Sequence, residues 1–375
     1  MQIKKQDILK ALETITEPGS GKSLIESNAV KNIVIFGKEV IVDVTISNPT
    51  LQAKKKTEVE IMKVIHDEVF QKADVKVNVK AVAPETPIAV EKANPLPKIK
   101  NIVAIASGKG GVGKSTITAN IAVSLSKMGF KVGILDADVY GPSIPIMFDV
   151  ADARPLSVVE DGISKMQPVE SYGVKLLSLG FFTDANQAVI WRGAMASKAL
   201  NQLLFEAAWG DLDFMLIDLP PGTGDIHLSI VQAIPLTGAV IVSTPQNIAL
   251  ADAKKGVAMF KQENINVPVL GLVENMSYFT PAELPDNKYY IFGKDGVKHL
   301  AEDMGSRFLG EVPLVQSIRE AGDVGHPVSL QDNTPLEAAF KLITKNMVEE
   351  LVKRNDSLPP TEIVRITDMA GCGTK

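Results

Sequence analysis

Apolar and polar residues follow two different patterns along this chain, and the change occurs near residue 99. In the first region, some segments carry apolar side chains at helical spacing and others alternate as strands do. The helical segments are residues 6–15 and 57–71, and the strand-like segments are residues 30–36, 40–46 and 75–79. Gly37 and Lys38 separate the first two strands and read as a hairpin turn. The pattern predicts a small α+β domain over residues 1–82.

From residue 99 onward, short and mostly apolar runs alternate with amphipathic segments. The runs are residues 102–106, 131–135, 214–217, 239–243 and 269–273, and a helical pattern over residues 116–128 follows the first of them. Strands buried on both faces, alternating with helices, are typical of a parallel sheet. We therefore predict an α/β domain over residues 99–354, with a mainly parallel sheet and helices on both faces. The functional loops of such a domain lie at the carboxyl ends of its strands.

Proline marks the ends of this second region. Residues 83–98 contain Pro84, Pro87, Pro95 and Pro97 and few large apolar side chains, which is typical of a semi-rigid, extended linker. Residues 355–375 are polar and again contain proline, so we expect a flexible C-terminal tail.

The composition narrows the classes of function. Of the 375 residues, 45% are hydrophobic and 22% are charged, and the net charge is −5. An acidic chain argues against broad binding of nucleic acid, which needs clustered Lys and Arg. No apolar stretch approaches the roughly 18 to 20 residues of a membrane span, so we expect no membrane partner. The single cysteine, Cys372, excludes an internal disulfide and favours a cytoplasmic location.

Residues 108–115 read Gly-Lys-Gly-Gly-Val-Gly-Lys-Ser and match the phosphate-binding pattern G-x-x-x-x-G-K-[ST]. The glycines let the backbone curl so that its N–H groups face phosphate oxygens, and the following helix adds its positive end. Lys114 supplies a cation for the β- and γ-phosphates of ATP, and Ser115 supplies a ligand for Mg²⁺. The alternative, a glycine turn that binds nothing, is disfavoured by the strand before the loop and the helix after it. The predicted ATP-binding residues are Gly108, Lys109, Gly110, Gly111, Val112, Gly113, Lys114, Ser115 and Thr116.

Carboxylates follow two of the apolar runs. Asp136 and Asp138 come after one run, and Asp218 ends another, shortly before Gly222. Phosphoryl transfer needs a carboxylate near Mg²⁺ and a group that orients the attacking water. An aspartate after a strand also commonly caps a helix. This alternative applies most strongly to Asp136.

Lys109 gives the phosphate loop a second lysine, in the pattern K-G-G-x-G-K-[ST]. The pattern resembles the deviant Walker A motif of dimeric ATPases that include septum-site, plasmid-partition and nitrogenase-iron proteins. In that group the early lysine reaches the nucleotide of the partner subunit. The resemblance therefore implies a P-loop NTPase fold, an ATP-dependent homodimer and a catalytic role for Lys109. A solvated loop lysine is the alternative.

Further segments resemble the Mrp/NBP35 (ApbC-like) family of iron–sulfur cluster carrier ATPases. They are residues 136–143 (Asp-Ala-Asp-Val-Tyr-Gly-Pro-Ser), 217–225 (Ile-Asp-Leu-Pro-Pro-Gly-Thr-Gly-Asp), 242–246, 274–279 and 318–323. The first region resembles, more weakly, the MIP18-like domain often fused to this family. The resemblance implies an ATPase that assembles iron–sulfur clusters or transfers them to apoproteins.

The same resemblance implies roles for particular residues. Asp218 corresponds to the Walker B aspartate near Mg²⁺. Asp138 corresponds to the switch I aspartate that orients water, with Asp136 in support and Lys114 on the phosphates. Gly222 could offer its N–H to the γ-phosphate. Asn275 and Pro313 look like walls of the adenine pocket, and the amide of Asn275 can both donate and accept hydrogen bonds. A strand-end turn asparagine is the alternative for Asn275.

The sequence departs from this family at its cluster site. Many members carry a C-x-x-C pair after the 274–279 segment, where two pairs in a dimer would hold a [4Fe–4S] cluster. Residues 280–288 of this chain contain no cysteine. Cys372 in the tail is the remaining thiolate, either a ligand that works with others or a free thiol without a role. The alternatives to a cluster carrier are an ATP-gated dimeric scaffold and a positioning ATPase.

Overall fold

The computed structural model describes residues 4–18, 21–48, 50–81, 94–160, 162–182, 193–281, 283–284, 286–361 and 363. The chain divides into two compact units, Met1–Lys92 and Ala93–Lys375. The Cys372 prediction and most of the predicted linker lie outside the described residues. Within the described residues, no helix is both long enough and apolar enough to cross a membrane.

The first unit is a three-stranded sheet with two helices. Its elements are α1 (Lys5–Leu12), β1 (Val30–Phe36), β2 (Glu39–Ile46), α2 (Leu51–Glu68) and β3 (Asp74–Ala81). Strand β2 lies in the middle, antiparallel to β1 and parallel to β3. Val40, Val42 and Val44 alternate along β2 and are fully or almost fully buried. The alternating burial of these valines matches the alternating apolar pattern from which the strand was predicted.

Helix α2 begins earlier than the predicted segment 57–71. The side chain of Thr50 accepts a hydrogen bond from Ala53 N, 3.2 Å away, and caps the helix at Leu51. An N-cap threonine satisfies a backbone donor that the helix itself leaves free. The lysines at 54–56 therefore belong to the early turns of α2 and do not precede it.

The second unit is built on an eight-stranded sheet in the order β13-β12-β11-β4-β10-β5-β9-β8. All neighbouring strands are parallel except β8 and β9. The strands are β4 (Ile99–Ala106), β5 (Val132–Asp136), β8 (Val169–Ser171), β9 (Val174–Ser178), β10 (Leu212–Asp218), β11 (Gly238–Ser243), β12 (Val269–Asn275) and β13 (Phe308–Val312). The mainly parallel sheet of a P-loop NTPase, predicted from the apolar runs and the phosphate loop, is confirmed.

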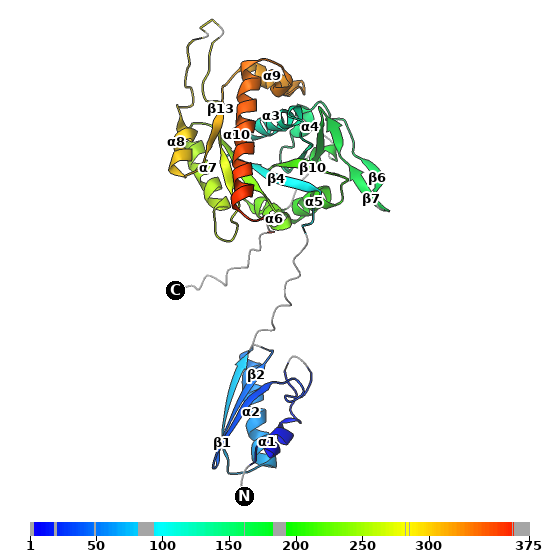
Figure 1. Ribbon diagram of the computed structural model, residues 1–375, viewed down its shortest axis with the longest axis vertical. Helices are drawn as coiled ribbons and strands as arrows, with labels where there is room; N and C mark the ends of the chain where they lie inside the picture. Colours follow the sequence, from blue (N-terminus) through cyan, green and yellow to red (C-terminus); the bar gives the residue numbers. More distant parts are fainter. Residues whose placement is uncertain are drawn as a thin grey trace. The chain divides into compact units, whose positions relative to one another are not determined.

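Helices cover both faces of this sheet (Figure 1). Alternate residues of β4 show why: Ile102 and Ala104 belong to one apolar core, whereas Val103 and Ile105 belong to the other. The first core contains residues from α5 (Gly193–Phe205), α6 (Asp225–Ala233), α7 (Asn247–Phe260) and α8 (Gly296–Asp303). The second contains residues from α3 (Lys114–Lys127), α4 (Ile144–Met147), α9 (Gln316–Asp323) and α10 (Pro335–Ser357).

The ends of the second unit differ slightly from the predicted boundaries. Leu96, within the predicted linker, is buried in the core of the second unit. Helix α10 continues through Ser357, beyond the predicted domain end at residue 354.

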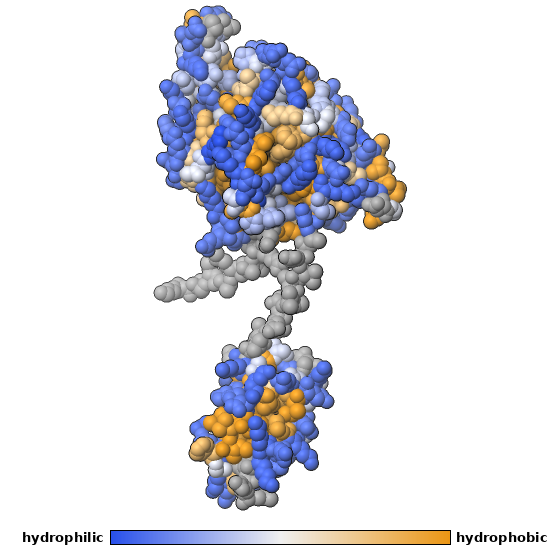
Figure 2. Space-filling view, in the orientation of Figure 1, coloured by the Kyte–Doolittle hydropathy of each residue, from blue (hydrophilic) through white to orange (hydrophobic). Residues whose placement is uncertain are grey.

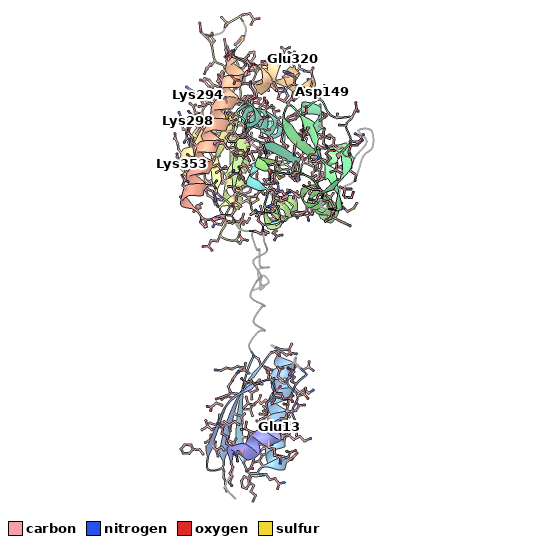
Figure 3. The ribbon with its side chains drawn as sticks, turned by 45° about the vertical axis from the view of Figure 1, so that its right-hand side comes forward. Glu13, Asp149, Lys294, Lys298, Glu320 and Lys353 are labelled. Carbon is pink, nitrogen blue, oxygen red and sulfur yellow. The ribbon has the colours of Figure 1, made fainter. Side chains whose placement is uncertain are left out.

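Charged side chains such as Lys298 on α8 and Lys353 on α10 are exposed on the outer faces of their helices (Figure 3).

A hairpin of β6 (Leu156–Glu160) and β7 (Ile163–Gln167) projects from the second unit (Figure 1). Leu156, Val159 and Ile163 are each more than 60% exposed there, and Figure 2 shows an apolar area on the hairpin. The hairpin lies beside the edge of the main sheet and contributes no side chain to the predicted ATP site.

Candidate nucleotide site

The phosphate loop connects β4 to α3 at the carboxyl end of the central strand. Two of its glycines cannot be replaced without a clash. A Cβ on Gly113 would lie 2.1 Å from Asn275 Nδ2, and the φ angle there is +81°. A Cβ on Gly108 would lie 2.1 Å from the backbone of Asp252 in α7. The loop is therefore shaped by close packing against neighbouring segments as well as by its own flexibility.

Asp218 gathers the polar side chains behind this loop. Its Oδ2 accepts hydrogen bonds from Lys114 Nζ at 2.7 Å and from Ser115 Oγ at 2.6 Å. Its Oδ1 accepts a hydrogen bond from Thr118 Oγ1 at 2.6 Å. Asp218 is fully buried and Lys114 is 6% exposed, so the charge of each is compensated mainly by the other. The predicted phosphate lysine, Mg²⁺ serine and Walker B aspartate thus lie together.

The two aspartates that follow β5 lie on the other side of Lys114. Asp138 Oδ2 is 3.8 Å from Lys114 Nζ. Burial raises the pKa of Asp138, and the charge of Lys114 partly offsets this. The aspartate predicted to orient water therefore lies within reach of the cation predicted to bind phosphate.

Asp136 accepts hydrogen bonds from three donors. Only one of them, the backbone N–H of Ile144, belongs to the first turn of a helix, α4. Ser178 Oγ donates to its Oδ2 at 2.9 Å, the backbone N–H of Ile144 donates to the same oxygen at 3.3 Å, and that of Asp138 donates to Oδ1 at 3.2 Å. Burial, followed by the nearby charge of Asp218, raises the pKa of Asp136 to about 8. Asp136 thus fixes the backbone of the segment that carries Asp138.

The loop after β10 packs against the phosphate loop. The backbone N–H of Gly222 donates to Ser107 O at 2.9 Å, and Gly222 has a φ of +94°. In this arrangement the N–H predicted for the γ-phosphate is already hydrogen-bonded within the protein. Lys109 is exposed on its loop, and no hydrogen bond or ion pair joins its ammonium group to the described residues.

A cavity of about 390 Å³ lies beside the loop and contains the predicted adenine residues. Thr116, Asn275 and Pro313 all line it. Asn275 Nδ2 donates to Val112 O at 2.8 Å, which leaves the amide oxygen to accept from a base. Met276, the next residue, adopts a left-handed φ of +56° and also lines the cavity.

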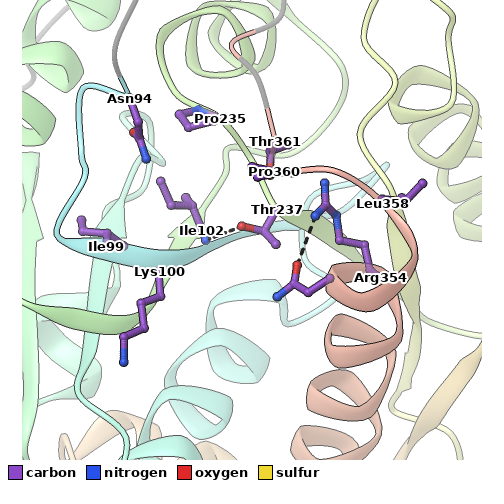
Figure 4. A pocket seen from close by; sticks show the side chains of 11 residues that line it. Asn94, Ile99, Lys100, Ile102, Pro235, Thr237, Arg354, Leu358, Pro360 and Thr361 are labelled. Carbon is purple, nitrogen blue, oxygen red and sulfur yellow. Dashed lines mark hydrogen bonds between the residues drawn. The ribbon is translucent and has the colours of Figure 1, made fainter.

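A second cavity, of about 270 Å³, lies at the amino ends of β4 and β11 (Figure 4). Ile99, Thr237 and Arg354 are among its lining residues, and none of the predicted site residues lines it. The predicted chemistry is therefore gathered at the opposite, carboxyl ends of the strands.

Comparison with known proteins agrees with this geometry. A family model described as NUBPL iron-transfer P-loop NTPase matches residues 98–348, and one described as iron-sulfur cluster assembly protein matches residues 5–90. The chain belongs to the NUBPL iron-transfer P-loop NTPase family. The family predicted from the sequence motifs is confirmed.

Individual relatives of this family cover most of the chain. An iron-sulfur cluster carrier protein of Aquifex aeolicus is 40% identical over 365 residues, covering 91% of this chain and 96% of the relative. An iron-sulfur cluster transfer protein of Dictyostelium discoideum is 48% identical over 255 residues, covering 68% and 77%. A nucleotide-binding protein from Archaeoglobus fulgidus, solved with ADP, matches with a TM-score of 0.55 and 38% identity over 64% of this chain and 92% of that chain.

This NUBPL-family chain has no obvious iron–sulfur site among its described residues. Within them, no group of three or more His, Cys, Asp or Glu side chains could hold a metal ion. The segment after Asn275 instead packs aromatic rings. Lys288 Nζ lies 3.8 Å from the ring centroid of Tyr278, and Phe279 pairs with Tyr289 through backbone hydrogen bonds.

Sequence reasoning missed two side chains that complete the site. Thr118 lies one helical turn after Lys114, which places both on one side of α3 near Asp218. Ser178 ends β9, the strand beside β5. The spacing of Thr118 could have been read from the sequence, whereas the pairing of β9 with β5 could not.

Proposed function

We propose that this protein binds Mg²⁺–ATP at the carboxyl ends of β4, β5 and β10 and hydrolyses it slowly. Hydrolysis drives a conformational switch that controls assembly or transfer of iron–sulfur clusters to apoproteins. The observation that carries the nucleotide site is the convergence of Lys114 and Ser115 on one carboxylate oxygen of Asp218. The family membership supports the cluster as cargo.

The residues fit Mg²⁺–ATP. The cradle from Gly108 to Thr116 has glycines where a Cβ would collide with Asn275 or Asp252. Mg²⁺ prefers oxygen ligands, and it usually binds one or two carboxylates together with phosphates and water. Ser115 would ligate Mg²⁺ directly, and Asp218 would contact it through water. Bound Mg²⁺ would neutralise charge on the phosphates.

The roles proposed for the site residues combine the family resemblance with their present contacts. Lys114 would exchange Asp218 for the β- and γ-phosphates, and Gly222 would exchange Ser107 O for the γ-phosphate. Asp138 would orient the attacking water, while Asp136 holds its backbone through the hydrogen bond from Asp138 N.

Lys109, exposed and without a described partner, would reach the nucleotide of a second copy. Asn275 and Pro313 would hold the adenine.

The cargo requires ligands beyond the described residues. In a homodimer, two copies of Cys372 would supply two thiolates, and a [4Fe–4S] cluster would need further ligands from a thiol cofactor or a client protein. We propose this non-standard ligation in a cytoplasmic protein that consists of a small α+β domain, a linker, a P-loop ATPase domain and a C-terminal tail. An ATP-gated scaffold that carries no cluster is the second candidate, since the described residues hold no cluster of metal ligands.

ATP turnover by Lys114→Ala tests the nucleotide site. Lys114 is the buried cation of the site, so its loss should lower turnover by at least about 100-fold, the scale of one well-placed electrostatic contact. Lys298→Ala, which removes an exposed lysine on α8, is the matched control and should turn over ATP normally. A folded Lys114→Ala protein with full activity would refute the assignment.

A further inference from the structure

His227 lies in the first turn of α6, where the 220–224 loop ends. The side chain is 1% exposed, and neither Nδ1 nor Nε2 has a hydrogen-bond partner in the described part of the chain. Buried polar atoms in native proteins are hydrogen-bonded with few exceptions. Two unpaired nitrogens on one buried ring therefore require an explanation.

The ring is neutral and close to acceptors that it does not bind. Burial lowers the pKa of His227 to about 4, and the nearby charge of Lys114 acts in the same direction. The carbonyl groups of Gly224 and Pro220 lie near enough to raise the pKa in part, yet neither forms a hydrogen bond of acceptable geometry. A neutral imidazole carries one N–H donor and one acceptor. A small movement of the loop would complete a bond.

The loop is poised to make such a movement. Gly222 N donates to Ser107 O in the present arrangement, and a Cβ placed on Gly222 would meet nothing within 4 Å. Pro220 is buried, but Pro221 and Gly224 are exposed, so little packing opposes a shift of residues 221–224. A γ-phosphate that takes the Gly222 N–H would pull the loop away from Ser107.

We infer that His227 is a positioning residue for ATP hydrolysis. When Gly222 turns from Ser107 to the γ-phosphate, the ring N–H of His227 donates to the carbonyl of Pro220 or Gly224 and holds the loop in its hydrolysing position. This inference rests on the proposed ATPase function. The bond forms only in the loop position from which water attacks, so it should act on kcat and leave the KM for ATP almost unchanged.

Two substitutions separate this role from a structural one. His227→Phe keeps a ring of similar shape and removes both nitrogens, whereas His227→Gln keeps a donor and an acceptor. We expect kcat of His227→Phe to fall about three- to tenfold, the scale of one net hydrogen bond, with KM changed less than about twofold. Its melting temperature should not fall, because two unpaired buried polar atoms are removed. His227→Gln should recover most of the lost kcat.

The wild-type ring offers a measurement that needs no substituted protein to be active. Its nitrogen-15 resonance, assigned by its absence from the His227→Gln spectrum, should shift toward that of a hydrogen-bonded imidazole when Mg²⁺–ADP with aluminium fluoride, a mimic of the hydrolysing phosphate, binds. An unchanged resonance, or a His227→Phe protein with wild-type kcat beside an inactive Lys114→Ala protein, would overturn the inference alone. Absence of turnover in the wild type would instead refute the proposed function and the inference with it.

Discussion

The buried carboxyl group of Asp136 should make the free energy of unfolding of the nucleotide-free protein depend on pH. Burial, and then the charge of Asp218, raise its pKa from 3.8 to about 8. Between these values the folded protein retains a proton that the unfolded chain releases. The contribution of Asp136 alone should therefore lower the free energy of unfolding as pH rises from about 4 to 8.

Asp136→Asn removes the titrating group, so its stability should fall less steeply with pH than that of the wild type. Urea unfolding at pH 5.5 and pH 8 measures the difference. Asp149→Asn, at an exposed position labelled in Figure 3, is the control and should keep the wild-type slope. Equal slopes for wild type and Asp136→Asn would show that Asp136 titrates as an exposed carboxylate does.

Gly113 tests the contact between the phosphate loop and the adenine cavity. A Cβ at this position would lie 2.1 Å from Asn275 Nδ2, whereas a Cβ on Gly111, which has a similar φ of +79°, would meet nothing within 4 Å. Both alanine variants carry backbone strain, but only Gly113→Ala adds a clash. We expect Gly113→Ala to be less stable than Gly111→Ala by about 1–3 kcal/mol in chemical unfolding. Equal stabilities would contradict the close packing of Asn275 on the loop.

At the scale of elements, Thr118 joins α3 to β10 through the carboxylate of Asp218. Thr118→Val keeps the size of the side chain and removes the hydroxyl, leaving one oxygen of a buried carboxylate without this donor. We expect a loss of about 1–3 kcal/mol in the free energy of unfolding.

Thr118→Ser is the matched variant, since it keeps the hydroxyl and loses only a methyl group. It should be more stable than Thr118→Val in the same urea titration. If the serine variant proves the less stable of the two, packing of the methyl group and not the hydrogen bond to Asp218 would be the main contribution of Thr118.

The central strands could be predicted from the sequence because burial on both faces leaves them almost wholly apolar. The edge strands could not. Strand β9, beside the short edge strand β8, is interrupted by Lys175, whose amine donates to Trp209 O at 2.8 Å. Strand β13 contains Gly310 and Glu311. The exposed β6–β7 hairpin has no consistent apolar face, and only the fold shows that β9 brings Ser178 to Asp136.

At the scale of the whole molecule, the two units differ in how much of their function can be predicted from the sequence. The motifs of the second unit predicted the phosphate loop and its carboxylates, because phosphate chemistry fixes residue types at fixed spacings. The first unit matches a cluster-assembly family, yet its residues show no comparable constellation of reactive groups in the described part. The proposed dimer and the proposed cluster ligation involve a second copy of the chain, so no pattern within one chain predicts their contacts.

Iron and acid-labile sulfide content after anaerobic reconstitution tests the central proposal, a cluster carrier without the usual cysteine pair, most directly. The measurement compares wild type with Cys372→Ser, each with and without Mg²⁺–ATP. We predict about four irons and matching sulfide per wild-type dimer, the content of one [4Fe–4S] cluster, and a marked loss in Cys372→Ser. No iron above background in the wild type, while a relative with the C-x-x-C pair is loaded in parallel, would contradict cluster carriage and favour the ATP-gated scaffold.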